Sequence, residues 1–285
     1  MSDLAPALVH PPRRKVMPHV LRVWLVLVLV FCFSPLAIVA ILSFNRSPYG
    51  TLPFEFTIKW YRQLFTEQAL LTATWRNVVL SAGVGLSAAI LGTPLALWLR
   101  RAPRILSLPV RTALMGAITI PWLLLAVGML VVLRQIGFGR GLTAMYLGCL
   151  AVSLPYVVFM VQTRLDSLDP ALEHAAQSLG ARPFAVFLRV TLPMIASAVA
   201  AGGFMAFITC FNNFVIQYFT APIGYRTLPL EIYTMVKMGY KPDINALGTI
   251  LVVISIALVV ALQRLTGNAG RLLTMSKGEG PKDHG

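Results

Sequence analysis

Residues that commonly do chemistry in proteins are scarce in this chain and lie outside its apolar stretches. All four histidines fall outside the six uncharged runs described below: His10, His19, His174 and His284. The sequence holds no His-Glu-x-x-His pair, no Gly-x-Ser-x-Gly turn and no Gly-x-x-x-x-Gly-Lys-Ser/Thr phosphate loop. We therefore expect no catalytic residue, no metal site, no cofactor and no ATPase site of its own.

The three cysteines lie inside the apolar stretches and far apart in sequence: Cys32, Cys149 and Cys210. This spacing indicates neither a disulfide framework nor a cysteine-based metal site. We interpret the three thiols as small apolar packing residues.

Two adjacent amides, Asn212 and Asn213, stand inside the longest uncharged run, residues 190–225. An unpaired polar group at lipid depth is costly, so both amides need partners. One interpretation is that they bond between helices as structural contacts. The other is that at least one of them lines a translocation path, where an amide can both donate and accept hydrogen bonds with a polar solute.

The uncharged runs predict the fold that positions these residues. Six of them contain no Asp, Glu, Lys, Arg or His: 23–45, 77–99, 112–133, 141–163, 190–225 and 244–263. Each reaches or exceeds the roughly 20 residues that a helix needs to cross about 30 Å of hydrocarbon. We predict an all-α integral membrane protein with six transmembrane helices.

The net charge of +14 is distributed over the loops rather than gathered in one patch. When the loops alternate between two sides, the side with both termini holds the larger share of the 24 lysines and arginines. The positive-inside rule then places both termini in the cytoplasm. This distribution favours a lipid bilayer as the partner and not a nucleic acid.

The run after Arg22 exceeds the apolar core of a signal peptide, and no Ala-x-Ala site follows it, so we expect a membrane anchor. The chain divides into four segments. Residues 1–21 form a cytoplasmic tail, 22–70 the first transmembrane helix and an outer segment, 71–264 a five-helix core domain with an inner loop at 164–190, and 265–285 a second cytoplasmic tail.

The inner loop 164–190, between helices 4 and 5, predicts a helical hairpin on the cytoplasmic surface. Asp169 is a good N-cap, Pro170 suits the first helical position, and Gly180 supplies a left-handed stop. Glu173 lies in the first turn, where negative charge is favoured. A helix of about ten residues is too short to be stable alone. It therefore docks on its own membrane helices or on a partner, and local sequence leaves both open.

This loop resembles the Glu-Ala-Ala loop of ABC importer permeases. That pattern is Glu-Ala-Ala, three residues, Gly, nine residues, an aliphatic residue, any residue, then Leu-Pro. The resemblance implies a coupling helix that fits a groove on a cytoplasmic ATPase subunit. Its candidate residues here are Glu173, His174, Ala175, Ala176, Gly180, Val190, Leu192 and Pro193. In one departure, His174 takes the place of the motif Glu, and Glu173 stands one residue earlier.

Residues 20–265 resemble the subgroup that includes the second permease of spermidine/putrescine transporters. The likeness is carried by Trp60-Tyr61, by Leu-Pro-Leu-Glu-Ile-Tyr at 228–233 and by Pro-Asp-Ile-Asn-Ala at 242–246. It implies a bacterial inner-membrane permease with a second permease subunit, two ATP-binding subunits and an extracytoplasmic solute-binding protein. The implied solute is a polyamine or another small polar compound such as an opine.

Two alternatives come from other classes. An ion-coupled secondary transporter usually carries ionisable groups at membrane depth, although Na⁺ can be held by backbone carbonyls. A non-transport polytopic membrane protein would need no ATPase partner. The absence of charge in the six runs disfavours an ion-coupled transporter. The inner loop disfavours a non-transport protein.

Overall fold

The computed structural model describes residues 16–47, 53–137, 139–169, 171–239, 243–257 and 260, and these are helical with one isolated β-bridge and no strand. In chain order the helices are α1 (Val16–Leu42), α2 (Lys59–Thr66), α3 (Gln68–Arg101), α4 (Arg104–Thr119), α5 (Trp122–Gln135), α6 (Leu142–Asp166), α7 (Ala171–Ser178), α8 (Pro183–Val186), a π-helical turn (Phe187–Thr191), α9 (Leu192–Phe211), α10 (Phe214–Thr220), α11 (Leu228–Lys237) and the helix Asp243–Ala257.

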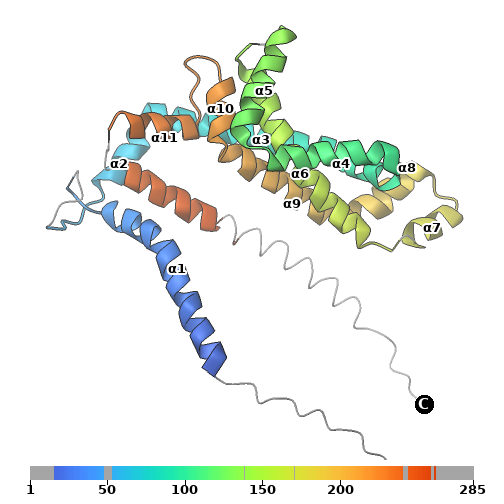
Figure 1. Cartoon of the computed structure of the whole chain (residues 1–285), viewed down its shortest axis with the longest axis horizontal. Coiled ribbons are helices and arrows are strands. Elements are labelled where there is room, and N and C mark those ends of the chain that lie inside the picture. The colour runs from blue at the N-terminus through green and yellow to red at the C-terminus, as the bar shows by residue number, and fades with distance from the viewer. Residues whose placement is uncertain are drawn as a thin grey trace, which may run out of the picture.

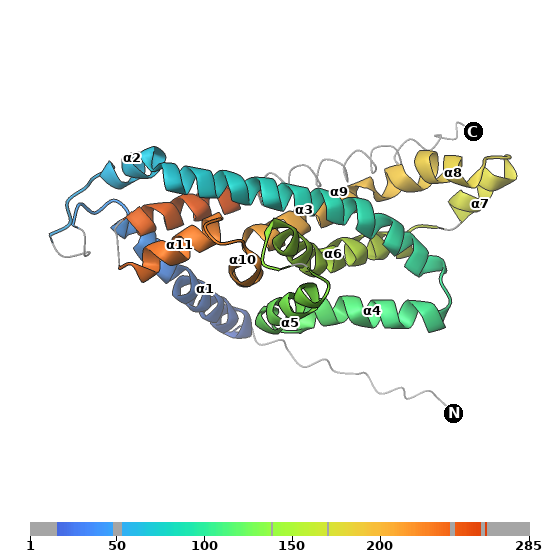
Figure 2. The same ribbon diagram turned by 90° about the horizontal axis from the view of Figure 1, so that it is seen from above.

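Three long helices, α3, α6 and α9, pack against one another and form the centre of the molecule (Figure 2). Glycines bring their backbones close. A Cβ atom on Gly85 would lie 2.8 Å from the Gly203 carbonyl oxygen, and one on Gly202 would lie 2.9 Å from the Val157 Cα. Small side chains permit such close approach in a membrane bundle. These glycines therefore serve packing within this chain.

The buried thiols belong to this core. Cys149 of α6 and Cys210 of α9 lie in one apolar cluster with Met145 and Ile216. The interpretation as packing residues fits both, whereas Cys32 on α1 is exposed.

Within the described part of the chain, four helices are long and apolar enough to cross a membrane: Leu21–Leu42, Gln68–Arg101, Leu142–Asp166 and Pro183–Phe211. Helices α4 and α5 make a fifth span only when counted together, because they are bent by 117° at the break between them. The helix Asp243–Ala257 is apolar but shorter. The described residues thus give an all-helical protein with four or five spans, and the count of six remains a prediction.

The uncharged run 112–133 is broken, although its composition predicts one continuous helix. Helix α4 ends at Thr119, and Ile120 is extended, with φ −68° and ψ 133°. Pro121 then precedes α5. Proline lacks an N–H donor and disfavours the helical conformation in the residue before it. The run therefore forms two helices joined at Pro121, as expected of a proline that kinks a helix or starts one.

Helix α1 begins at Val16, inside the segment 1–21 that was predicted to be a tail. Its side chains from Leu21 to Phe33 are exposed, and the helix leans away from the core (Figure 1). Residues 1–15 and the predicted tail 265–285 lie outside the described residues. A bare apolar helix of this kind needs lipid or another protein around it.

Two pairs of short helices occupy opposite ends of the long axis. Helices α7 and α8 lie at one end, and α2 and α11 lie at the other (Figures 1 and 2). At the second end, α2, α11 and the helix Asp243–Ala257 share an apolar cluster that includes Leu64, Leu228 and Leu247.

Candidate functional site

The inner-loop helix α7 begins and ends as its sequence predicts. The Asp169 Oδ1 accepts a hydrogen bond from the Ala171 backbone N–H at 2.8 Å. Gly180 has a φ of +84°, and its N–H donates to the Gln177 carbonyl at 2.9 Å. The predicted cap and the predicted left-handed stop are therefore confirmed. Pro170 lies outside the described residues.

The described membrane helices of this chain leave most of the apolar face of α7 uncovered, although Val186 of α8 is buried. Helix α7 buries none of its residues, all of which the structure describes. Leu179 is 89% exposed, and Phe184, in α8, is 72% exposed. Leu172 and Ala175 are also exposed. Of the two docking alternatives for this hairpin, its exposure favours a partner.

The second half of the hairpin runs without interruption into a membrane helix. Residues Pro183–Phe211 form one apolar helical stretch, so the span begins earlier than the uncharged run 190–225 indicates. The π-helical turn that contains Val190 precedes Leu192, whose N–H donates to the Phe187 carbonyl. Pro193 then sits at the second position of α9. A first-turn proline is tolerated because its missing N–H has no obligatory partner there.

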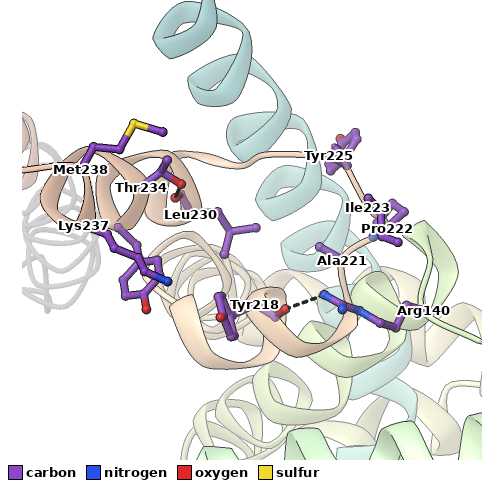
Figure 3. Close-up of a pocket in the computed structure, with 12 residues that line it drawn as sticks. Arg140, Tyr218, Ala221, Pro222, Ile223, Tyr225, Leu230, Thr234, Lys237 and Met238 are labelled. Atoms are coloured by element: carbon purple, nitrogen blue, oxygen red, sulfur yellow. Dashed lines mark hydrogen bonds between the residues drawn. The ribbon is translucent and has the colours of Figure 1, made fainter.

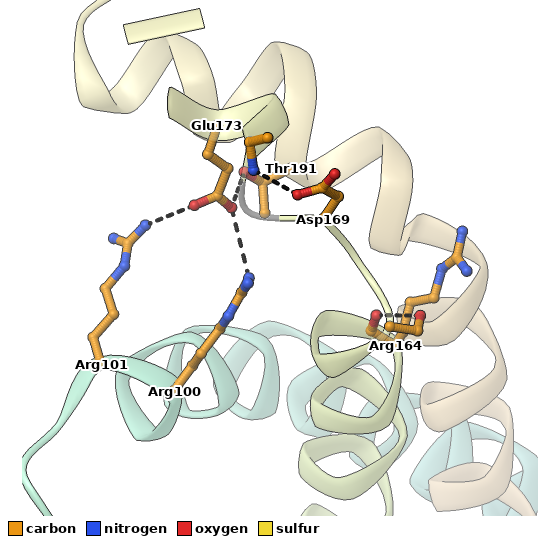
Figure 4. A network of polar contacts seen from close by, with 8 residues as sticks. Arg100, Arg101, Arg164, Asp169, Glu173 and Thr191 are labelled. Carbon is orange, nitrogen blue, oxygen red and sulfur yellow. Dashed lines mark hydrogen bonds and ion pairs between the residues drawn. The ribbon is translucent and has the colours of Figure 1, made fainter. Parts of the chain in front are cut away.

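Glu173 turns inward, toward the membrane helices. Its carboxylate lies 3.4 Å from Arg101 Nη2 and 3.8 Å from Arg100 Nη1, at the end of α3. It also accepts a hydrogen bond from the Thr191 hydroxyl at 3.0 Å. Figure 4 shows the two arginines and Thr191 converging on this one carboxylate. The Glu173 side chain is 19% exposed, whereas the adjacent His174 is an exposed residue.

The motif residues thus separate into two groups. Glu173 bonds to its own chain, while His174 and Ala175 remain exposed on α7. Beneath α7, a groove of about 680 Å³ is lined in part by Pro94, Arg100 and His174. Close by, the Arg164 Nε donates to the Met194 carbonyl at 3.1 Å and ties α6 to α9.

The amide pair lies at a break between two helices. Helix α9 ends at Phe211, and α10 begins at Phe214. The prediction that both amides lie within a continuous helix was therefore wrong. The Asn213 side chain explains the break, because its Oδ1 accepts from the Ile216 N–H at 2.8 Å and caps α10. Asparagine competes with the backbone for such bonds and favours caps over helix interiors.

The two amides have different surroundings. Asn213 is fully buried, and its Nδ2 has no hydrogen-bond partner among the described residues. Asn212 is exposed and borders a mostly apolar pocket of about 410 Å³ that includes Phe214 and Tyr233. Of the pair, only Asn212 presents its amide to a surface.

Buried amides and hydroxyls around the break satisfy the carbonyls that the end of α9 leaves free. Asn77 of α3 donates to the Phe211 carbonyl at 3.1 Å, and Gln217 donates to the Cys210 carbonyl at 2.8 Å. The Thr227 hydroxyl donates to the Gln217 Oε1. Sequence reasoning missed this network, although amides inside uncharged runs are the signal that could have found it.

A third cavity lies where α10, α11 and the loop between them meet. It measures about 610 Å³, and no carboxylate is present among the described residues that line it, which include Arg140 and Lys237. Arg140 donates to the Tyr218 carbonyl at 3.0 Å and so holds α10 (Figure 3). At the edge of this pocket, Ile223 is 96% exposed.

The geometry describes a class of protein: a membrane bundle with an uncovered helical hairpin at one end and a broken, amide-bonded helix in its core. Residues 88–272 match the family described as the binding-protein-dependent transport system inner membrane component. The chain belongs to this family, whose members are the permease subunits of ABC importers.

Two curated transport proteins are similar in sequence to this chain over most of its length. The chain is 32% identical over 246 residues to the spermidine/putrescine transport system permease protein PotC of Escherichia coli K12, covering 84% of this chain and 93% of that protein. It is 31% identical over 246 residues to the putrescine transport system permease protein PotI of the same organism, covering 82% and 88%.

A solved structure shares the fold. The crystal structure of a bacterial alginate ABC transporter, in complex with an alginate pentasaccharide-bound periplasmic protein, matches with a TM-score of 0.67 at 18% identity. The match covers 88% of this chain and 93% of that one. Family membership favours an ABC-type permease over the two alternatives drawn from other classes.

Proposed function

We propose that this chain forms half of the solute pathway of a bacterial ABC importer and couples it to ATP hydrolysis carried out elsewhere. The partners are a second permease subunit, two cytoplasmic ATP-binding subunits and an extracytoplasmic solute-binding protein. One observation carries the coupling role: a well-capped helix, α7, stands at one end of the molecule with no buried residue. The sequence has no phosphate-loop motif, so the energy for transport comes from the ATP-binding subunits.

The topology follows from this assignment. The chain is a multi-pass protein of the bacterial inner membrane, with six spans and both termini in the cytoplasm. The bent pair α4–α5 counts as one span, and the helix Asp243–Ala257 begins the sixth. The hairpin of α7 and α8 is then the cytoplasmic coupling element, and the loop between α10 and α11 lies outside.

Substitution of one small residue tests the coupling role. Ala175 is exposed, so Ala175→Glu leaves the fold of this chain intact but puts a charge on the face that meets the ATP-binding subunit. We expect uptake to be lost and co-purification of the ATP-binding subunit to weaken. The matched control is Ala175→Ser, which keeps the residue small and should transport normally. Normal uptake in Ala175→Glu would show that this face meets no partner.

The proposed solute is a polyamine, spermidine or putrescine, because the two similar curated permeases are named for these compounds. Asn212 lines the path, since its exposed amide can donate to or accept from a polar solute. Uptake of radiolabelled spermidine by cells that express the complete transporter tests the proposal.

A small polar compound such as an opine is the second candidate solute. It is favoured by the neutral Asn212–Asn213 pair and by the pocket whose described lining residues include Arg140 and Lys237 but no carboxylate. These groups suit a zwitterion better than a polycation. Competition of unlabelled octopine against labelled spermidine distinguishes the two candidates.

A further inference from the structure

The Glu173 carboxylate joins three elements that the sequence keeps far apart. It belongs to α7, it faces Arg100 and Arg101 at the last turn of α3, and it accepts from Thr191 at the base of α9. At 19% exposure this carboxylate is partly shielded from water, so its charge contacts are stronger than those of an open surface pair. The Arg100 side chain is itself only 24% exposed.

We propose that Glu173 is a positioning residue that transmits displacement of α7 to α3 and α9, and that it does not itself contact the ATP-binding subunit. The proposal rests on the coupling role proposed above. In this arrangement His174, at the motif position, is exposed where it lines the groove beneath α7 and can meet the partner, while the neighbouring carboxylate is bonded within this chain. His174 then makes the contact of the coupling helix with the partner, and Glu173 makes its contact with α3 and α9.

The two helices held by Glu173 are also joined at their far ends. Asn77, near the start of α3, donates to the Phe211 carbonyl at the end of α9 at 3.1 Å. Helices α3 and α9 are thus linked at both ends, by Glu173 at one end and beside the Asn212–Asn213 break at the other. A displacement of α7 is therefore transmitted to that break through both helices.

Pro94 is a position at which α3 can bend. It lies inside α3 and lines the groove beneath Glu173, two turns before Arg101. A proline within a helix removes one backbone hydrogen bond and weakens the helix at that point. The last two turns of α3 carry both arginines and also the buried Ala96 and Leu99, so a tilt of these turns with α7 moves the core residues that pack on them.

Hydrogen exchange of the assembled transporter in nanodiscs tests this proposal without knowledge of the solute. ATP with vanadate is added to wild-type transporter and to Glu173→Gln, and amide exchange is followed in 171–179 and in 212–220. In wild type we expect both segments to change. In Glu173→Gln the change in 171–179 should persist, while the change in 212–220 falls at least about fivefold, the lower end of typical coupling between two sites.

Two further variants sharpen the test. Asp166→Asn removes an exposed carboxylate that makes no ion pair among the described residues, and it should behave as wild type. Thr191→Val removes the hydroxyl that bonds Glu173 and should weaken transmission, while Thr191→Ser keeps the hydroxyl and should preserve it.

The outcomes separate this proposal from the proposed function. Transmission in Glu173→Gln equal to that of wild type overturns the role of Glu173, as does loss of the ATP-binding subunits from this variant, because the carboxylate would then be an assembly contact. A wild-type segment 212–220 that does not respond overturns it as well. Failure of 171–179 to respond in wild type contradicts the coupling function itself.

Discussion

Gly180 ends helix α7, the proposed coupling helix, in a conformation that few other residues adopt. Its φ of +84° lies in the left-handed region, where a β-branched side chain is strained by roughly 1–2 kcal/mol. Among the residues that the structure describes, no other group lies within 4 Å of the position that a Cβ would occupy. Backbone conformation, and not lack of space, therefore restricts this position.

The first prediction is that Gly180→Val abolishes uptake while the protein still inserts in the membrane. The valine forces the chain out of the left-handed stop and redirects the segment that leads to α8. Gly180→Asn is the matched control, because asparagine tolerates this conformation, and it should retain most of the uptake. Labelled spermidine uptake and immunoblots of membranes measure both effects. Equal uptake in the two variants would contradict this role of the stop.

The second prediction separates the two amides. Asn212→Leu should lower uptake while the ATP-binding subunits still co-purify, because Asn212 is exposed at a pocket. Asn213→Leu should instead reduce the amount of folded protein, since it removes a cap worth about 1 kcal/mol from α10. Asn212→Gln keeps an amide and serves as the control. Full uptake by Asn212→Leu would remove this residue from the path.

At the scale of elements, buried hydrogen bonds bridge the break after α9, inside an apolar cluster. Gln217 is fully buried; it donates to the Cys210 carbonyl and accepts from the Thr227 hydroxyl. Removing this amide leaves the buried Thr227 hydroxyl without its acceptor, at about 1–3 kcal/mol, whereas the Cys210 carbonyl still accepts from the Asn213 backbone N–H.

The third prediction follows from that network. Gln217→Leu should lower the melting temperature of the purified transporter, whereas Thr227→Ser, which keeps the hydroxyl, should leave it nearly unchanged. Differential scanning fluorimetry in detergent measures the shift. A Gln217→Leu transporter as stable as wild type would mean that water or rearrangement satisfies the freed groups.

The uncharged runs located most of the membrane helices but not their interruptions. The break at Ile120-Pro121 and the break at Asn212-Asn213 both fall inside runs that a charge count reads as continuous. Proline and asparagine act on the backbone locally, and neither carries a charge. The cap and the stop of α7, by contrast, could be predicted, because each depends only on residues within one helical turn.

Contacts between distant residues could not be predicted from the sequence. Arg101 lies 72 positions before Glu173, and Asn77 lies 134 positions before Phe211. A single sequence gives no register between such segments. The inward direction of Glu173 could therefore be found only once α3, α7 and the turn before α9 were placed together.

At the scale of the whole molecule, the orientation in the membrane decides what each end does. The fourth prediction is that reporter fusions at Gly137 register the outer face and fusions at Arg182 the cytoplasm. The physical reason is the excess of basic residues on the side with both termini. Alkaline phosphatase and green fluorescent protein fusions give opposite readouts and check one another. A reversed pattern would remove the coupling assignment along with the orientation.

The central claim is that the exposed hairpin meets an ATP-binding subunit, and photo-crosslinking from position 179 tests it most directly. Leu179 is 89% exposed, so a photoreactive amino acid there disturbs no internal packing. The same amino acid at position 223, where Ile223 is 96% exposed in the loop between α10 and α11, is the control. The account predicts a crosslink to the ATP-binding subunit from position 179 and none from position 223. Crosslinks from position 179 only within this chain, or an ATP-binding subunit captured from position 223, would contradict it.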